Sequence, residues 1–173
     1  MSWTIKPANS SCIERCSDIL VQSRVGKTYF PNKQNIQGRI GESLDSDEIF
    51  VAINKDNEID GFVWFQMRGA FSFFPFLYMI ATDPNQHRKG LARKMMDYYE
   101  QYVLYKQVPK RLSTKSFLLV AEFNTAAQSL YRNLGYIEVA RLQALYRKRI
   151  DEILMMKDIR KSDYAKSQFS DRH

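Results

Sequence analysis

A short polar segment that ends in a glycine holds most of the residues that could bind an anion. His87, Arg88 and Lys89 come directly before Gly90, and a strong helical pattern begins at Leu91. The first turn of a helix exposes unpaired N–H groups at the positive end of its dipole, and glycine permits close backbone approach. We therefore expect a phosphate-binding loop here. The segment has neither a Walker motif nor the dinucleotide fingerprint, and an ordinary solvated helix start would show the same basic residues.

A second set of polar residues shares one face of a later predicted helix. Asn124, Ala127 and Tyr131 stand at helical spacing. The amide offers a donor and an acceptor, the alanine leaves room for a ligand, and the phenol can give a proton. A structural interpretation fits equally, with Asn124 as the helix N-cap and Tyr131 in the core.

Cysteine and histidine are too few to build a metal centre. The two histidines are His87 and the terminal His173, and the two cysteines are Cys12 and Cys16. The cysteines lie four residues apart on the apolar face of a predicted helix, without zinc-ligand or disulfide-framework spacing. We expect reduced core cysteines and no metal.

The composition of the 173 residues is that of a soluble globular protein, with 45% apolar residues and a net charge of +7. This charge favours an anionic partner. A nucleic acid is not expected, because no basic stripe is interleaved with exposed aromatic residues. The longest apolar run, residues 73–81, is about half of a membrane span, so no membrane partner is expected. The N-terminus has no apolar signal core, and we expect a cytoplasmic protein.

The elements that must position these residues form a mixed α+β chain. Periodicity predicts helices from Ser11, with a Ser11–Glu14 capping box, and over 36–44, separated by a loop at 27–31. It predicts later helices from Leu91 to before Pro109 and over 124–134. Strands are predicted at 2–6, 49–53, 59–67, 73–81, 116–121, 136–145 and 152–156. The central strand–helix–strand–helix segment requires parallel pairing somewhere in the sheet.

Two of these segments resemble the Gcn5-related N-acetyltransferase (GNAT) family. Residues 80–93 are similar to its acetyl-CoA loop, where the pattern is Gln or Arg, two residues, Gly, one residue, and Gly or Ala. His87, Gly90 and Ala92 fill these places, and His87 departs from the usual residue.

The second cofactor segment of the family resembles residues 120–136, with Asn124, Tyr131 and a final glycine followed by an aromatic residue. The last strand of the family is similar to residues 153–157. The resemblance extends over residues 48–158 and, more loosely, over the N-terminal helices.

The resemblance implies a three-layer α+β fold, with a mixed, mostly antiparallel sheet of about seven strands flanked by about four helices. It places a single acyltransferase domain at 1–158 and a polar tail at 159–173. Sequence leaves the oligomeric state open, a homodimer included.

The resemblance also implies a role for each site residue. Acetyl-CoA would be the co-substrate, and a primary amine of a small molecule or protein would be the acceptor. Tyr131 would be catalytic, giving a proton to the thiolate. Backbone groups of Ile80, Ala81 and Thr82 would pair with the pantetheine arm, which Asn124 would also bind. The pyrophosphate would lie on the loop and helix start, formed by His87, Arg88, Lys89, Gly90, Leu91, Ala92 and Arg93.

The expected mechanism is direct attack of the amine in a ternary complex, because neither cysteine lies in the cofactor segments. Some relatives carry a glutamate that acts as the general base at the position of Phe76, and others carry it at the position of Leu119. Both residues are apolar here. Glu122 and a backbone-held water are the remaining candidates for the base.

The acceptor side would be lined by the N-terminal helices, with Arg24, Tyr29, Phe30 and residues 42–48 as candidates. The acids at 42–48 could attract a cationic amine or form a solvated turn. The aromatic residues at 71–76 could form an acceptor pocket or belong to the core. A non-catalytic module that keeps the fold and binds CoA or a protein is the alternative function.

Overall fold

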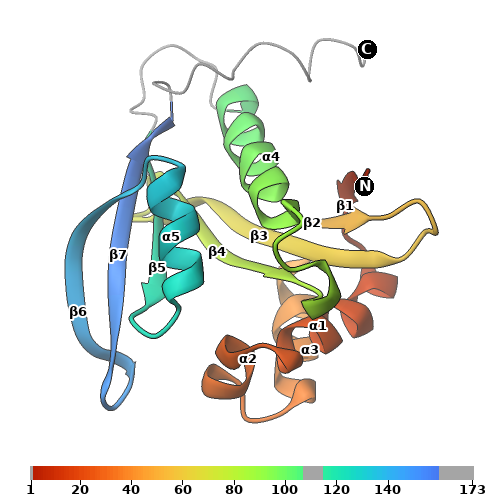
Figure 1. Cartoon of the computed structure of the whole chain (residues 1–173), viewed down its shortest axis with the longest axis horizontal. Helices are drawn as coiled ribbons and strands as arrows, with labels where there is room; N and C mark the ends of the chain where they lie inside the picture. The colour runs from red at the N-terminus through yellow and green to blue at the C-terminus, as the bar shows by residue number, and fades with distance from the viewer. Residues whose placement is uncertain (1, 107–114, 160–173) are drawn as a thin grey trace.

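A computed structural model of the chain describes residues 2–106 and 115–159. Seven strands form one sheet in the order β1-β2-β3-β4-β5-β7-β6, and β4 and β5 are its only parallel neighbours among the described strands (Figure 1). The strands are β1 (Thr4–Pro7), β2 (Glu48–Ile53), β3 (Ile59–Ala70), β4 (Phe74–Thr82), β5 (Lys115–Ala121), β6 (Ile137–Arg147) and β7 (Ile150–Asp158).

Five α-helices accompany the sheet in the described part of the chain. They are α1 (Ile13–Gln22), α2 (Arg24–Tyr29), α3 (Lys33–Ser43), α4 (Leu91–Lys106) and α5 (Thr125–Asn133). Two short 3₁₀ turns, Ser10–Cys12 and Pro84–Gln86, precede α1 and follow β4. None of the described helices is long and apolar enough to cross a bilayer.

The strands alternate between two buried faces, which makes the fold three-layered. Along β2, Ile49 and Val51 join the cluster under α1 and α3, whereas Phe50 and Ala52 join the cluster under α4 and α5. Because successive side chains of a strand point to opposite faces, a strand that is buried throughout needs a helical layer on each side. The fold is thus the predicted α+β arrangement with parallel pairing in its middle.

The cysteine prediction is confirmed: Cys12 and Cys16 are both free and buried. Burial, and the neighbouring Cys12, raise the pKa of the Cys16 thiol to about 12. A thiol with so high a pKa stays protonated at neutral pH and is a poor nucleophile.

Two details of the N-terminal half differ from the prediction. Helix α2 (residues 24–29) covers the first part of the predicted loop at 27–31, and the side chain of Ser23 caps this helix by accepting from the Gly26 N–H. Phe30 is extended, as its position before Pro31 requires, but the restriction stops at Phe30 and leaves the helix before it intact. The predicted capping box is also wrong, since Asn9, and not Ser11, supplies the cap at the chain's first turn.

The sequence predicts that the polar tail begins after residue 158. Ile159 is fully buried in the core, and residues 160–173 lie outside the described residues. The other predicted strands and helices are present, with ends that move by a few residues.

Candidate active site

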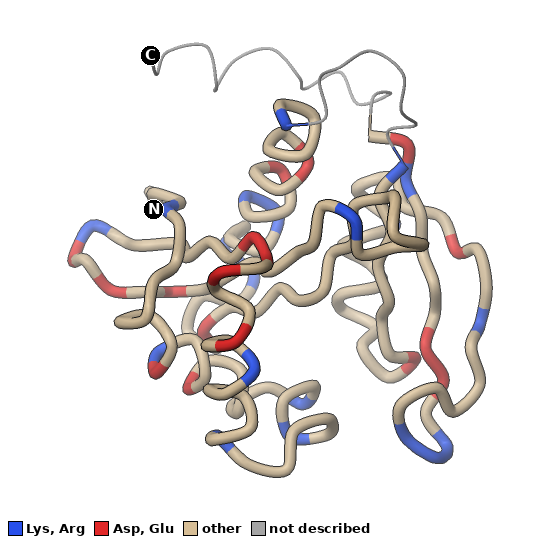
Figure 2. The backbone as a smooth tube through the Cα atoms, turned by 180° about the vertical axis from the view of Figure 1, so that it is seen from behind, with Lys and Arg blue, Asp and Glu red and all other residues tan. Residues whose placement is uncertain are grey.

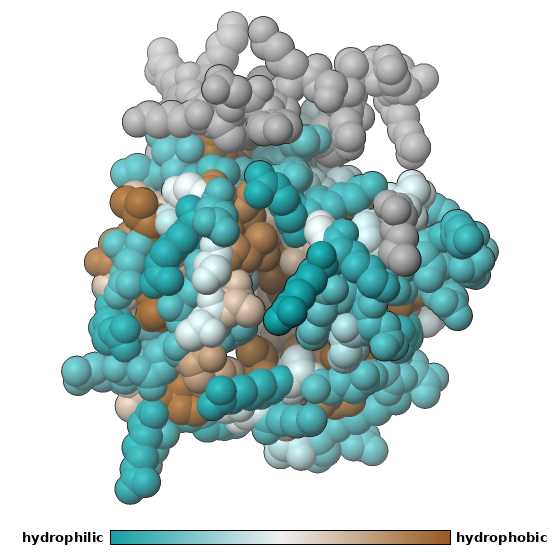
Figure 3. Space-filling model, viewed as in Figure 1, coloured by the Kyte–Doolittle hydropathy of each residue, from teal (hydrophilic) through white to brown (hydrophobic). Residues whose placement is uncertain are grey.

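The site begins where β4 and β5 separate. The two strands pair only at Phe76↔Phe117 and Leu77↔Leu118, whereas β4 remains paired with β3 as far as Thr82. Beyond Leu77 the edge of β4 that faces β5 therefore has none of the described strands beside it, and Figure 1 shows the sheet opening into two halves at this point. A cavity of about 1120 Å³ occupies the opening. Figure 3 shows the hollow on this face, with apolar residues in its depth and polar ones around it.

The loop after β4 is fixed by Asp83, which is 6% exposed. Its carboxylate accepts from the Asn85 N–H at 2.8 Å and from the Arg15 guanidinium of α1 at 2.6 Å. Burial alone would raise the pKa of Asp83, but the Asn85 amide and the Arg15 charge outweigh it and lower the pKa below 3.8. The loop is thus tied to both the strand end and the first helix.

The start of α4 presents its backbone to the cavity. Arg88 and Gly90 have positive φ values of 61° and 86°, and a Cβ placed on Gly90 would meet no other atom within 4 Å. The amides of Leu91, Ala92 and Arg93 belong to the first helical turn, so they have no acceptor within the helix. Open space beside unpaired N–H groups suits an anionic group such as a pyrophosphate.

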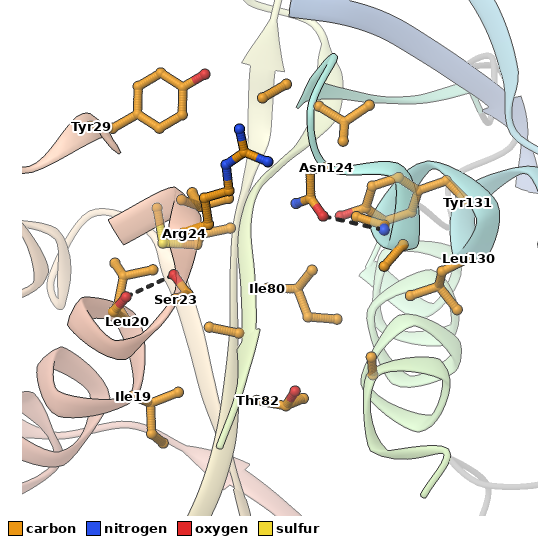
Figure 4. A pocket seen from close by; sticks show the side chains of 18 of the residues that line it. Ile19, Leu20, Ser23, Arg24, Tyr29, Ile80, Thr82, Asn124, Leu130 and Tyr131 are labelled. Atoms are coloured by element: carbon orange, nitrogen blue, oxygen red, sulfur yellow. Dashed lines mark hydrogen bonds between the residues drawn. The ribbon is translucent and has the colours of Figure 1, made fainter. Parts of the chain in front are cut away.

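Asn124 and Tyr131 face this space from the other half of the sheet (Figure 4). Asn124 is the N-cap of α5, and its Oδ1 accepts from the Ala127 N–H at 3.4 Å. This confirms the structural interpretation of Asn124, and its side-chain amide nitrogen still points into the cavity (Figure 4).

Tyr131 combines the two interpretations that sequence left open. Its ring is 5% exposed and packs against Tyr136, with 6.0 Å between the ring centroids. Its hydroxyl end is nevertheless directed toward Asn124 and the cavity, and it has no hydrogen-bond partner among the described residues (Figure 4). Burial raises the pKa of Tyr131 well above 10, so the phenol is protonated at neutral pH.

All but one of the predicted site residues line the cavity, and the exception is Lys89. The ammonium of Lys89 donates instead to Gln86 Oε1 at 3.3 Å. No group of three or more histidine, cysteine or acidic side chains in residues 2–106 and 115–159 is arranged to hold a metal ion.

Comparison with known proteins decides the family. A model of the acetyltransferase (GNAT) family matches residues 15–136. The chain belongs to the GNAT family. No curated protein matches the sequence.

Solved GNAT structures have the same fold. An acetyltransferase of the GNAT family from Bacillus cereus has 19% sequence identity and a TM-score of 0.70, with 91% of this chain and 98% of that chain covered. The ribosomal-protein-S18-alanine N-acetyltransferase from Escherichia coli has 22% identity and a TM-score of 0.70, covering 91% and 94%. The yncA protein from Salmonella typhimurium, solved with its cofactor acetyl-CoA, has 15% identity and a TM-score of 0.69, covering 92% and 95%.

The two positions at which the resemblance implied a glutamate as general base, Phe76 and Leu119, do lie at the cavity. Their side chains cannot accept a proton. Glu122 does not line the cavity. Its carboxylate is bound to Arg141 at 3.2 Å and to the Asp151 N–H at 3.3 Å. These contacts disfavour Glu122 as a candidate for the base.

A buried carboxylate that sequence reasoning missed lines the cavity instead. Glu152 of β7 is 3% exposed and accepts a hydrogen bond from the hydroxyl of Tyr29 on α2. Burial and the nearby Glu122 charge raise the pKa of Glu152, against the hydrogen bond from Tyr29. No local motif marks Glu152, because its place at the cavity depends on the pairing of β7 with Ala121 at the end of β5.

The N-terminal residues expected on the acceptor side line the cavity only in part. Arg24, Tyr29 and Phe30 are at its wall, as expected, whereas residues 42–48 are not. Asp47 instead accepts from the Trp64 indole at 2.7 Å and from the Gln66 amide at 3.1 Å. In the aromatic stretch at 71–76 only Phe76 lines the cavity, and Phe71 is 72% exposed elsewhere.

Proposed function

We propose that the protein transfers an acetyl group from acetyl-CoA to a primary amine by direct attack within a ternary complex. The observation that carries the proposal is the separation of β4 from β5, which brings an unpaired strand edge, the start of α4 and the Tyr131 hydroxyl to one cavity. Family membership supports a transferase.

The cavity suits acetyl-CoA in two ways. The unpaired edge of β4 at Met79–Thr82 can bind the amide groups of a pantetheine arm as an added strand would. The first-turn amides of α4 and the side chains of Arg88 and Arg93 can hold a pyrophosphate. The amide nitrogen of Asn124 is directed into the cavity on the side of β4, where it can bind the pantetheine arm (Figure 4).

When bound, acetyl-CoA supplies a thioester, whose carbonyl carbon accepts the amine nitrogen while its C–S bond breaks. Tyr131 gives a proton to the leaving sulfur. A phenol is a weaker acid than a thiol in water, but an apolar site raises the pKa of the thiol as well, since a buried thiolate loses its solvation. The high pKa of Tyr131 keeps its proton in place until the thiolate forms.

Glu152 is the proposed acceptor of the proton that the amine loses. It is the only carboxylate among the described residues that line the cavity, and its raised pKa brings it closer to neutral pH than an exposed glutamate. Tyr29 holds it by a hydrogen bond and can relay the proton to it.

Turnover of a mixture of primary amines with acetyl-CoA, followed by mass spectrometry of the products, tests the proposal. Acetylated amine should form with the native chain and be strongly reduced with Tyr131→Phe. If acetyl-CoA binds and no amine in a chemically broad panel is acetylated, the activity proposed here is wrong. The apolar residues at positions 76 and 119 favour the second candidate in that case, a non-catalytic module that binds CoA.

A further inference from the structure

Arginine side chains surround the end of the cavity that lies away from α4. Arg24 of α2, Arg39 of α3 and Arg147 of β6 all line this end. Figure 4 shows the guanidinium of Arg24 extending into the cavity toward Asn124. Basic residues continue into the β6–β7 turn with Lys148 and Arg149, and Figure 2 shows this hairpin tip and the N-terminal helices at the same end of the molecule.

The three arginines are held in place without an acidic partner. Arg147 donates to the backbone oxygens of Thr28 at 3.2 Å and Tyr29 at 2.8 Å. Arg39 donates to the Tyr78 hydroxyl at 2.6 Å. None of the three takes part in a salt bridge with a described residue, so their positive charges are uncompensated within the described chain.

Arg24 is the arginine most available to a ligand. Its guanidinium carbon lies 4.3 Å from the centroid of the Phe123 ring, and it makes no hydrogen bond with a described residue. Stacking on an aromatic ring fixes the plane of a guanidinium while leaving its N–H edge open. That edge has the geometry to bind a carboxylate with two hydrogen bonds.

Nearby acids offset this charge only in part. Glu14 and Asp18 pair with Lys33, and Asp151 pairs with Arg141. Glu152, the only carboxylate among the described residues that line the cavity, carries at most one negative charge against the three arginines. A cationic group entering this end would meet net repulsion, whereas an anionic group would be attracted.

We propose that the acceptor is an amine that also carries a carboxylate, and that Arg24 binds this carboxylate while the amine faces the thioester. This inference rests on the proposed acetyl transfer and names the substrate class for the same site. It is opposite in sign to the expectation that acids at 42–48 attract a cationic amine.

Three amines of similar length but different tail charge test the inference. They are 4-aminobutanoate, 1-aminobutane and 1,4-diaminobutane, whose tails are anionic, neutral and cationic. We expect kcat/KM to be about tenfold or more higher for 4-aminobutanoate than for 1-aminobutane, and lowest for 1,4-diaminobutane. The preference should shrink as salt is added, because part of it is long-range attraction. Equal or faster turnover of 1,4-diaminobutane would overturn the inference.

The variant Arg24→Gln should lower kcat/KM for 4-aminobutanoate far more than for 1-aminobutane, and so abolish the preference for 4-aminobutanoate. Arg68→Gln is the matched control, since it removes the same charge from an exposed position of β3 outside the cavity. If the preference for 4-aminobutanoate is as large in Arg24→Gln as in the native chain, Arg24 does not bind the carboxylate. Two tetrapeptides that differ only by Asp or Asn at the second position show whether the carboxylate belongs to a small molecule or to a peptide.

A binding measurement separates this inference from the proposed function. The three amines are compared for their effect on thermal unfolding, with and without saturating CoA. Absence of any shift with acetyl-CoA would reject the proposed acetyl transfer, yet a larger shift with 4-aminobutanoate would still support the carboxylate site. If acetyl-CoA binds and 4-aminobutanoate has no advantage in turnover or in binding, only the inference about the acceptor fails.

Discussion

Tyr131 shows how one side chain can serve the core and the site together. Its ring packs against Tyr136 inside the core formed under α4 and α5, and only its hydroxyl end reaches the cavity. Burial holds the phenol in one position and keeps it protonated by raising its pKa. Sequence offered the core and the catalytic interpretations as alternatives, whereas the structure is compatible with both.

The first prediction is that Tyr131→Phe lowers kcat by about a hundredfold, the lower end of what a positioned proton donor contributes. The ring remains, so the melting temperature and the shift on acetyl-CoA binding should change little. Steady-state turnover and thermal unfolding measure the two effects. Tyr105→Phe, on the exposed part of α4, is the control. Unchanged turnover in Tyr131→Phe would remove the phenol from the mechanism.

The second prediction concerns Glu152 as the base. Glu152 must be deprotonated to accept a proton, so kcat/KM should fall as the pH falls through its raised pKa. Glu152→Gln should lower kcat/KM and remove this acidic limb from the pH profile. Glu42→Gln, an exposed residue outside the cavity, should leave the profile unchanged. A pH profile of kcat/KM that is the same in Glu152→Gln as in the native chain would remove Glu152 as the base.

At the scale of elements, the end of β4 depends on a single carboxylate. Asp83 joins the 3₁₀ turn after β4 to α1 through Arg15, and its N–H donates to the Asp60 oxygen of β3 at 2.7 Å. These bonds set the point at which the chain leaves the sheet and enters the loop before α4. We therefore expect the stability of this junction to depend on the charge of Asp83.

The third prediction is that Asp83→Asn lowers the free energy of unfolding by about 1–3 kcal/mol at pH 7. The pKa of Asp83 is lower in the folded chain than the ordinary 3.8, so the unfolded chain binds the proton more tightly. The stabilisation is therefore complete above about pH 5 and is lost as the pH falls through the folded-state pKa. Denaturant unfolding of both chains between pH 7 and pH 3 should show the difference shrink. Asp56→Asn, in an exposed turn, should cost little, and a constant difference across this range would contradict the account.

Local patterns predicted most elements because each carries its own signal. Gly135, the glycine after the predicted helix at 124–134, is left-handed with φ of 91° and ends α5, and Pro75 lies at the second residue of β4. Helix α2 was missed because six residues are too few to show a period, and its cap at Ser23 was the only clue. Glu152 was missed because its position depends on long-range pairing with Ala121.

At the scale of the whole molecule, the function depends on where a sheet stops pairing. Among the described residues, the β5-β7-β6 half pairs with the β1-β2-β3-β4 half at only two positions, and the cavity lies between the two halves. Sequence predicted a parallel pair in the sheet but not its length, because the register of distant strands is not encoded locally. The extent of this pairing is what allows the strand edge, the α4 start and Tyr131 to meet.

Thermal unfolding with and without acetyl-CoA tests this central claim most directly. A ligand that binds only the folded chain adds about 2.7 kcal/mol at 100 times its dissociation constant, which should raise the melting temperature by several degrees. The account predicts this rise in the native chain and a smaller one in Gly90→Asp, whose side chain would place a negative charge at the start of α4. No rise at millimolar acetyl-CoA would contradict it.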